Sequence, residues 1–313
     1  MLDSIDLIIY NIKWIDFKKL RLLGIEIKSK KLREGKTYWF EYKNIRFKFN
    51  PTKKYLLLIT NVKTLLGKRD VSLKDKEIYK SMVLGIVEEV IEEDVSIKLS
   101  RIDYCTDILL TDDEELKTYI EILKKYKHKY KYMRLEKSYD TSLYLTNGYG
   151  QFTFNFYDKY AESKNPVDKN ILRLEIQVNT PKLKKETKKG TPKILDEYWS
   201  KKSMNKYYFD VLKGYIYEGR YYKKGKIYKV INKSNLEKDY KRKLKKFIRD
   251  IDKKGIDEII ETKLLCRTTI EKYIKMLVNL GVNPVPIPNE SGFDELDNLY
   301  YKAREIAETR YFI

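Results

Sequence analysis

A tyrosine followed directly by an acid and a base ends the segment QFTFNFYDK, as Tyr157, Asp158 and Lys159. A phenol with a pKa near 10 is a weak nucleophile at neutral pH, and it becomes a useful one when a base or a nearby cation favours its ionised form. Attack on a phosphodiester would join the tyrosine to a 5′-phosphate and free a 3′-hydroxyl, while Lys159 stabilises the phosphate charge. Tyr157 is the first candidate among 28 tyrosines, and Tyr144 and Tyr160 stay open as alternatives.

Three carboxylates lie in two other strand-like segments. Asp103 and Asp107 belong to SRIDYCTDILL, and Glu175 belongs to ILRLEIQ. Aspartate is disfavoured inside strands, so two in one strand favour a role beyond solvation. Carboxylate oxygens suit a hard divalent cation, and the pattern predicts Mg²⁺ or Mn²⁺ held by these three residues. Such a cation would polarise a phosphate and neutralise developing charge.

The three strand-like segments, 100–110, 151–158 and 171–178, each separate polar from apolar side chains. Side chains alternate across a strand, so Tyr157 points away from the face formed by its phenylalanine neighbours. If the three strands are neighbours in one sheet, we expect a single polar face that gathers Arg101, Asp103, Asp107, Tyr157, Arg173 and Glu175. Arg101 and Lys159 are the expected cationic partners of the reaction. The alternative is a solvated sheet face without chemistry.

Histidine and cysteine set limits on the metal chemistry. His128 is the only histidine, so a histidine-based metal site is excluded. Cys105 and Cys266 lie far apart in the sequence and lack metal-binding spacing, and we expect two buried, reduced thiols.

The elements that must position these residues favour an α+β fold. The first ~180 residues alternate short strands with a few helices and contain no βαβ repeat, which predicts an antiparallel sheet with flanking helices. One helix is expected after Ser72, a plausible N-cap, with apolar residues at Ile78, Met82, Val83, Ile86 and Val90. We expect an α+β domain over residues 1–185, a basic helical segment over 186–254 and a third unit over 255–313.

The third unit resembles a helix-turn-helix. Short helices are expected over 256–261 and 268–280, and Gly281 ends the second helix. Recognition residues meet DNA at the start of the second helix of this motif. The DNA-binding candidates are Arg267, Thr268, Thr269, Lys272 and Lys275. A plain helical hairpin that completes the fold is the alternative.

The charge of the chain indicates a polyanionic partner. Lysine and arginine number 66 against 46 aspartates and glutamates, a formal net charge of +20. No apolar run approaches the ~20 residues of a membrane span, and the first residues do not resemble a signal peptide. Nucleic acid is thus favoured over a membrane, and a bacterial cytoplasm is the expected location.

Taken together, "RID…D", "FYDK..E" and "LRLEIQ" resemble the motifs of rolling-circle replication initiators. The pattern is similar to filamentous-phage replication proteins of the gene II and gene X type, and to the initiators of small staphylococcal plasmids and related relaxases. The resemblance covers roughly residues 1–220. It implies that Tyr157 is the nucleophile of a metal-dependent nicking and joining endonuclease. It also implies that Asp103 and Glu175 have metal or general-base roles.

The resemblance implies partners as well. They are origin DNA in double- and single-stranded form, a host helicase and polymerase, and a second copy of the chain in a homodimer. Two other functions stay open at this point. One is a non-catalytic DNA-binding regulator with a decayed nicking domain, and the other is a relaxase of a mobile element.

Overall fold

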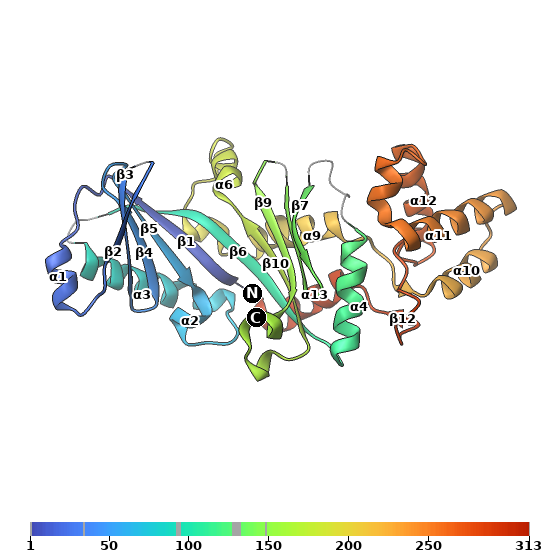
Figure 1. Ribbon diagram of the computed structural model, residues 1–313, viewed down its shortest axis with the longest axis horizontal. Helices are drawn as coiled ribbons and strands as arrows, with labels where there is room; N and C mark the ends of the chain where they lie inside the picture. The colour runs from blue at the N-terminus through green and yellow to red at the C-terminus, as the bar shows by residue number, and fades with distance from the viewer. Residues whose placement is uncertain (1, 34, 92–94, 127–132, 148, 313) are drawn as a thin grey trace.

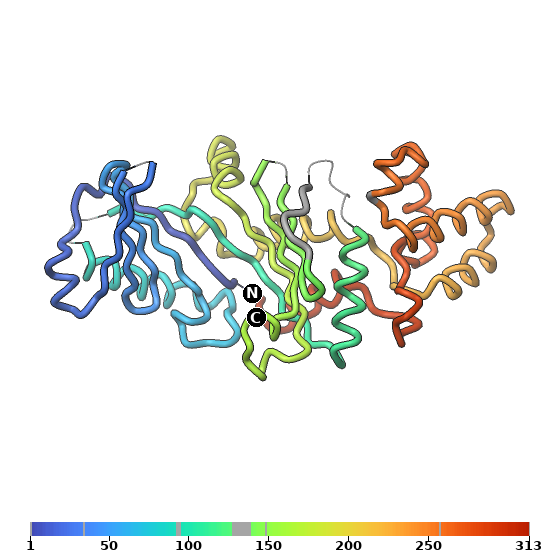
Figure 2. Tube along the Cα trace, viewed as in Figure 1, coloured from blue at the N-terminus to red at the C-terminus, as the bar shows by residue number. Residues whose placement is uncertain are grey.

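The computed structural model describes residues 2–33, 35–91, 95–126, 133–147 and 149–312. His128 lies outside these ranges. The β2–β5 region of the sheet lies at one end of the molecule and a helical lobe at the other, and the C-terminal segment returns from the lobe to the middle, close to the N-terminus (Figure 2).

One antiparallel sheet dominates the fold, with its ten strands in the order β2-β3-β4-β5-β1-β6-β10-β9-β8-β7. Their bounds are β1 Leu2–Tyr10, β2 Lys28–Leu32, β3 Gly35–Tyr42, β4 Ile45–Asn50, β5 Tyr55–Asn61, β6 Ile97–Leu109, β7 Met133–Tyr139, β8 Ser142–Asn147, β9 Phe152–Asp158 and β10 Ile171–Val178. A small ribbon joins β11 Tyr221–Tyr222 to β12 Glu295–Leu296. The long strand β6 links the β2–β5 half of the sheet to the β7–β10 half (Figure 1).

Helices fill most of the remaining chain. Those before β10 are α1 Phe17–Leu22, α2 Val62–Leu66, η1 Leu73–Asp75, α3 Lys76–Val90, α4 Asp113–Lys124, α5 Lys159–Ser163 and η2 Pro166–Asp168. Those after it are α6 Thr180–Thr187, α7 Leu195–Tyr198, α8 Lys201–Met204, η3 Asn205–Phe209, α9 Asp210–Tyr215, α10 Lys224–Lys233, α11 Lys238–Glu261, α12 Arg267–Asn279, α13 Leu299–Ile306 and η4 Ala307–Tyr311. None of these helices has the length and apolar character that crossing a bilayer requires.

The main core lies between one face of the sheet and the helices α3, α4, α9 and α13 (Figure 1). Phe154 and Phe156 of β9 pack their rings against Tyr215 of α9. The Tyr104 hydroxyl of β6 donates to the Tyr198 carbonyl of α7 at 2.6 Å. The predicted α+β class with an antiparallel sheet is confirmed, and so are the apolar faces of the three motif strands.

Helices α10, α11 and α12 form a separate lobe, whereas the later α13 packs beside the sheet (Figure 1). Gly255 has φ +75° and ψ 169°, so it breaks the helical path within α11, at the expected boundary between the basic segment and the third unit. The next amide, of Ile256, donates to the Lys125 carbonyl at 3.2 Å and ties the break to the end of α4. The two helices expected over 256–261 and 268–280 are therefore present.

Two expectations about individual residues are wrong. Ser72 does form a capping box with Asp75, but the following helix buries Tyr79 and leaves Ile78 and Met82 exposed. Val83, Ile86 and Val90 are buried as expected, so the buried stripe of α3 departs from the expectation only at Ile78 and Met82. Cys105 is buried as expected, whereas Cys266 is exposed, because it sits in the turn that precedes α12.

Candidate active site

Strands β6, β10 and β9 are adjacent, and their register places the polar motif residues on one face. Gln177 of β10 pairs with Asp103, and Arg173 pairs with Asp107 on one side and Tyr157 on the other. Glu175 lies two residues from each of these β10 positions. It therefore occupies the centre of the face, diagonal to both Asp103 and Tyr157.

The Tyr157 hydroxyl donates to Glu175 Oε2 at 3.3 Å. The other carboxylate oxygen of Glu175 accepts from Asn155 at 2.7 Å and from Gln177 at 3.1 Å. Tyr157 is only 6% exposed. Burial and the charge of Glu175 raise the pKa of the Tyr157 hydroxyl, while Arg173 lowers it. The tyrosine is therefore protonated at neutral pH, and its proton points at the nearest base.

Asp103, like Asp6 of β1, is only partly satisfied on this face. It is 1% exposed, and one of its oxygens pairs with Arg101 at 3.0 Å. Its Oδ1 atom has no hydrogen-bond partner among the described residues. Burial raises the pKa of Asp103 well above its usual range; Arg101 opposes this, and Glu175 adds to it. Burial likewise raises the pKa of Glu175. This end of the face therefore holds more negative charge than its cations offset.

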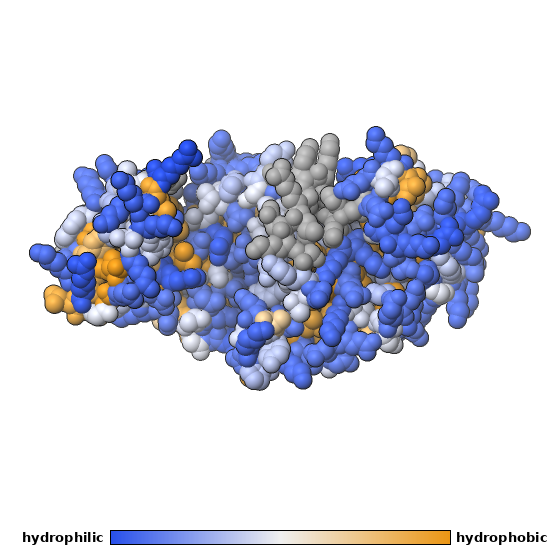
Figure 3. Space-filling model, in the orientation of Figure 1, coloured by the Kyte–Doolittle hydropathy of each residue, from blue (hydrophilic) through white to orange (hydrophobic). Residues whose placement is uncertain are grey.

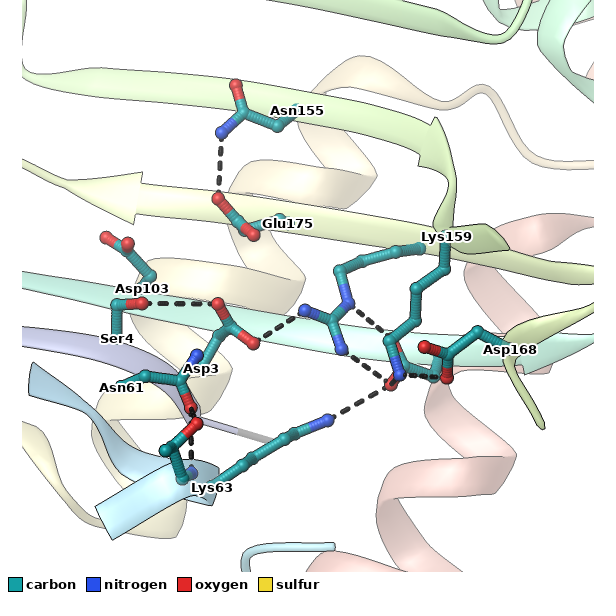
Figure 4. A network of polar contacts seen from close by, with 12 residues as sticks. Asp3, Ser4, Asn61, Lys63, Asp103, Asn155, Lys159, Asp168 and Glu175 are labelled. Carbon is teal, nitrogen blue, oxygen red and sulfur yellow. Dashed lines mark hydrogen bonds and ion pairs between the residues drawn. The ribbon is translucent and has the colours of Figure 1, made fainter. Parts of the chain in front are cut away.

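The other end of the face is a closed network of ion pairs around Asp107 (Figure 4). Arg173 donates to both Asp107 oxygens, at 2.6 and 2.8 Å, and to Asp3 at 2.6 Å. Lys63 of α2 lies 3.1 Å from Asp107, and Lys159 lies 3.5 Å from it. Burial by itself would raise the pKa of Asp107. The hydrogen bonds and charge of Arg173, together with the charges of Lys63 and Lys159, instead hold this pKa far below the usual range.

The predicted site residues thus separate into two groups. Asp103, Glu175, Tyr157 and Arg101 share one region, whereas Asp107 and Lys159 belong to the ion-pair network. Lys159 also pairs with Asp168 at 2.6 Å. The metal role of Asp107 remains a prediction, and its three cationic neighbours leave its charge already neutralised.

The unpartnered Asp103 oxygen and the adjacent Glu175 carboxylate fit a hard divalent cation. No group of three or more His, Cys, Asp or Glu side chains able to hold a metal ion is found among the described residues. Mg²⁺ usually binds proteins through one or two carboxylates and completes its shell with water and substrate phosphate. A cation held by Asp103 and Glu175 would need water and a DNA phosphate to complete its shell, and the metal stays a prediction.

Sequence reasoning missed several residues of this site. Asn155 and Gln177 hold Glu175, while Asp3, Lys63 and Asp168 complete the network around Arg173 and Lys159. Alternation placed Asn155 and Gln177 on the correct face, but only the strand register shows that they meet Glu175. No pattern in the sequence indicates that Asp3 contacts β10 or that Lys63 contacts β6, because both strands lie much further along the chain.

The predicted DNA-binding residues of α12 mostly have partners within the lobe. Arg267 pairs with Glu271 at 3.0 Å, and Lys272 donates to the Tyr240 hydroxyl at 2.6 Å. Hydrogen bonds join the hydroxyls of Thr268 and Thr269 to the Cys266 sulfur. Their role in DNA binding, like that of Lys275, remains a prediction.

The cationic side chains on one face of α11 have fewer ion-pair and hydrogen-bond partners than those at the start of α12. Five exposed cations recur every three or four residues, which places them along one side of the helix over about 22 Å. They are Lys238, Arg242, Lys246, Arg249 and Lys253. Lys238, Lys246 and Lys253 have no ion pair within the described part of the chain. Side chains on the visible side of this lobe are mostly hydrophilic (Figure 3).

The fold and the polar face define an α+β protein with a tyrosine, an acid pair and a basic helical lobe. The family model for the N-terminal part of the gene II type replication-associated protein matches residues 22–208, which is more than half of the chain and includes all three motif strands. The chain belongs to this family, and its resemblance to replication proteins of the gene II type is confirmed.

Comparisons with solved structures and with curated proteins contribute nothing further to the description of the site. A solved structure, the rolling circle replication initiator protein from Geobacillus stearothermophilus, is similar over 57% of this chain and 73% of its own length, with 12% identity and a TM-score of 0.32. This likeness is too distant to bear on the site. No curated protein matches the chain.

Proposed function

We propose that this chain initiates rolling-circle replication by binding origin DNA and nicking one strand through Tyr157. The observation that carries the proposal is the contact between the Tyr157 hydroxyl and Glu175, on the sheet face where one oxygen of the buried Asp103 has no hydrogen-bond partner among the described residues. Membership of a family of replication-associated proteins supports the choice of DNA as substrate.

The reaction needs one proton transfer and one exchange of bonds at phosphorus. Glu175 accepts the phenolic proton as the Tyr157 oxygen attacks the scissile phosphate. A Tyr–O–P bond forms, the bond from phosphorus to the 3′-oxygen breaks, and the 3′-oxygen leaves as a hydroxyl by taking up, through water, the proton that Glu175 accepted. The raised pKa of Glu175 suits a base, because a stronger conjugate base accepts a proton more readily. The same steps in reverse rejoin the strand.

A divalent cation bound to Asp103 and Glu175 would supply charge stabilisation at the phosphate. The protein contributes the rest of the site. Asn155 and Gln177 hold the Glu175 carboxylate in place, and Arg173 lies beside Tyr157 in the register, where its charge favours the phenolate. Arg101 stays within 3.0 Å of Asp103 and fixes its orientation.

The C-terminal lobe would hold duplex DNA beside the nicking site. The cations of α11 that lack ion pairs fit the phosphate backbone, whose contacts position a protein without reading sequence. Residues at the start of α12 would then read the origin, as the helix-turn-helix prediction states. A host helicase and polymerase would use the unwound strand and the free 3′-hydroxyl.

The test is a covalent adduct. The protein is incubated with Mg²⁺ or Mn²⁺ and supercoiled DNA from its own genetic element, then denatured and run on a gel. The expected adduct survives denaturation, disappears in Tyr157→Phe and persists in Tyr160→Phe, which removes an exposed hydroxyl nearby. An adduct that persists in Tyr157→Phe but disappears in Tyr144→Phe or Tyr160→Phe overturns the assignment. DNA binding without any nick, in every metal tried, favours a regulator.

A further inference from the structure

Three tyrosine rings form a connected series on the polar face of the sheet. Tyr144 of β8 lies opposite Asn155, and Ser142 lies opposite Tyr157, so Tyr144 and Tyr157 are diagonal neighbours on one face. Their ring centroids are 6.5 Å apart, and the rings are inclined by only 15°. Tyr139 of β7 meets Tyr144 edge to face, with centroids 6.4 Å apart. We call Tyr139, Tyr144 and Tyr157 the tyrosine series.

Exposure rises along the tyrosine series away from the candidate nucleophile. Tyr157 is buried, Tyr144 is half-buried, and Tyr139 is 53% exposed. The apolar core does not account for the two outer rings, because Leu143 and Leu145 of β8 point to the opposite, helix-covered face. The outer rings thus offer aromatic surface to a ligand that reaches Tyr157 from solvent.

We infer that Tyr144 and Tyr139 are a stacking platform for unpaired bases of the DNA strand that is cut. The inference rests on the proposed nicking function. A nucleotide whose phosphate meets the Tyr157 hydroxyl carries its base one sugar away, and Tyr144 is the adjacent ring. Stacking on aromatic side chains tolerates any base and requires the base to be out of the duplex. The platform therefore selects single-stranded DNA at the scissile position.

Geometry favours stacking over chemistry at Tyr144. Its ring lies nearly parallel to that of Tyr157, while no hydrogen bond is found between its hydroxyl and Glu175 among the described residues. Burial also raises the pKa of its hydroxyl, which disfavours the phenolate. Tyr144 therefore acts through its ring, and Tyr157 through its oxygen.

The experiment measures binding of a fluorescent single-stranded oligonucleotide of the origin sequence. A Tyr157→Phe background with EDTA prevents cleavage. Adding Tyr144→Ala is expected to weaken binding about 5- to 150-fold, the range for losing one stacked base. Tyr144→Phe, which keeps the ring, restores the affinity. Tyr139→Ala weakens binding without altering the sheet interior, and Tyr160→Ala, an exposed tyrosine outside the series, leaves it unchanged.

The outcomes separate this inference from the nicking proposal. Equal loss in Tyr144→Phe and Tyr144→Ala overturns the platform, because the hydroxyl would then be the active group. Unchanged binding in both Tyr144→Ala and Tyr139→Ala also overturns it, as does an equal loss of affinity for blunt duplex of the same sequence. Each result leaves the adduct test on Tyr157 untouched, and thermal unfolding of Tyr144→Ala checks that the sheet is intact.

Discussion

The Tyr157 hydroxyl and the Glu175 carboxylate face each other at 3.3 Å across adjacent strands of one rigid sheet. In the strand register, Glu175 lies diagonal to both the candidate nucleophile and Asp103, whose Oδ1 atom has no hydrogen-bond partner among the described residues. In the proposed reaction, Glu175 would accept the phenolic proton of Tyr157 on one side and share a cation with Asp103 on the other. Arg173, Lys63 and Lys159 belong to a separate network around Asp107. Substitutions in the two regions are therefore expected to have different effects on stability.

Arg173 is predicted to be a stability residue. Its guanidinium is buried and pairs with Asp107 and Asp3, so Arg173→Gln leaves two buried carboxylates short of a partner. Removing one partner of a buried ion pair costs about 3–5 kcal/mol. Urea unfolding should therefore show a much lower midpoint. The control is Lys43→Gln, which breaks the exposed Lys43–Glu89 pair and should leave the midpoint unchanged. Similar midpoints for the two variants would contradict the buried network.

Asp103→Asn and Asp107→Asn should change stability in opposite directions in the absence of divalent cations. The raised pKa of Asp103 means that its charged form opposes folding, so the stability penalty grows as pH rises above the usual aspartate range and vanishes on acidification. Asp103→Asn should raise the unfolding temperature at pH 7, by about 2–4 °C for each kcal/mol of penalty that it removes.

For Asp107, the ionised carboxylate has the opposite effect on the stability of the fold. Its pKa is lowered, so its charge stabilises the fold above the usual aspartate pKa, and that contribution is lost as pH falls. Asp107→Asn should lower the unfolding temperature at pH 7. Thermal scans at pH 7 and pH 4 of both variants provide the measurement, and a shift of the same sign in both would refute the division of the face into two regions.

The alternation of polar and apolar side chains along the strands allowed much of this site to be predicted from the sequence. Alternation within β6, β9 and β10 placed Tyr157, Asp103 and Glu175 on one face, because a strand's side chains can only point to two sides. The order of the strands and their register cannot be obtained this way, since they depend on pairing between distant segments. Asp103 and Asp107 share a face but lie four residues apart, about 13 Å along the strand. This spacing explains why they belong to different regions.

The sequence also does not reveal which charged side chains form ion pairs or hydrogen bonds with one another. Lys272 and Arg267 look like free cations at the start of a recognition helix, yet Tyr240 and Glu271 engage them. Three lysines without an ion pair among the described residues, Lys238, Lys246 and Lys253, lie on α11, where the sequence LEKDYKRKLKKFIRD shows only high charge. Which side chains pair depends on how α11 and α12 pack, which in turn depends on the break at Gly255.

Nicking should depend on pH and metal concentration together. The pKa values of Asp103 and Glu175 are both raised, so protons compete with a cation for these carboxylates at a higher pH than for ordinary ones. The rate of adduct formation should fall on acidification above the usual carboxylate range. Tenfold more Mg²⁺ should move this fall to lower pH. Initial rates between pH 5 and pH 8 at two Mg²⁺ concentrations measure it, and an acidic limb independent of Mg²⁺ would remove the two carboxylates from the metal site.

The basic face of α11 should account for much of the salt dependence of duplex binding. Each phosphate contact contributes a slope of about 0.9 in a plot of log affinity against log salt. The triple variant Lys238→Gln, Lys246→Gln, Lys253→Gln should therefore lower the slope by up to about 2.7, with equal weakening on origin and unrelated duplexes. The control is Lys243→Gln with Lys254→Gln, because these lysines pair with Asp239 and Glu258 and have less to offer phosphate. Equal slopes for the triple variant and the unmodified protein would show that DNA does not follow this helix.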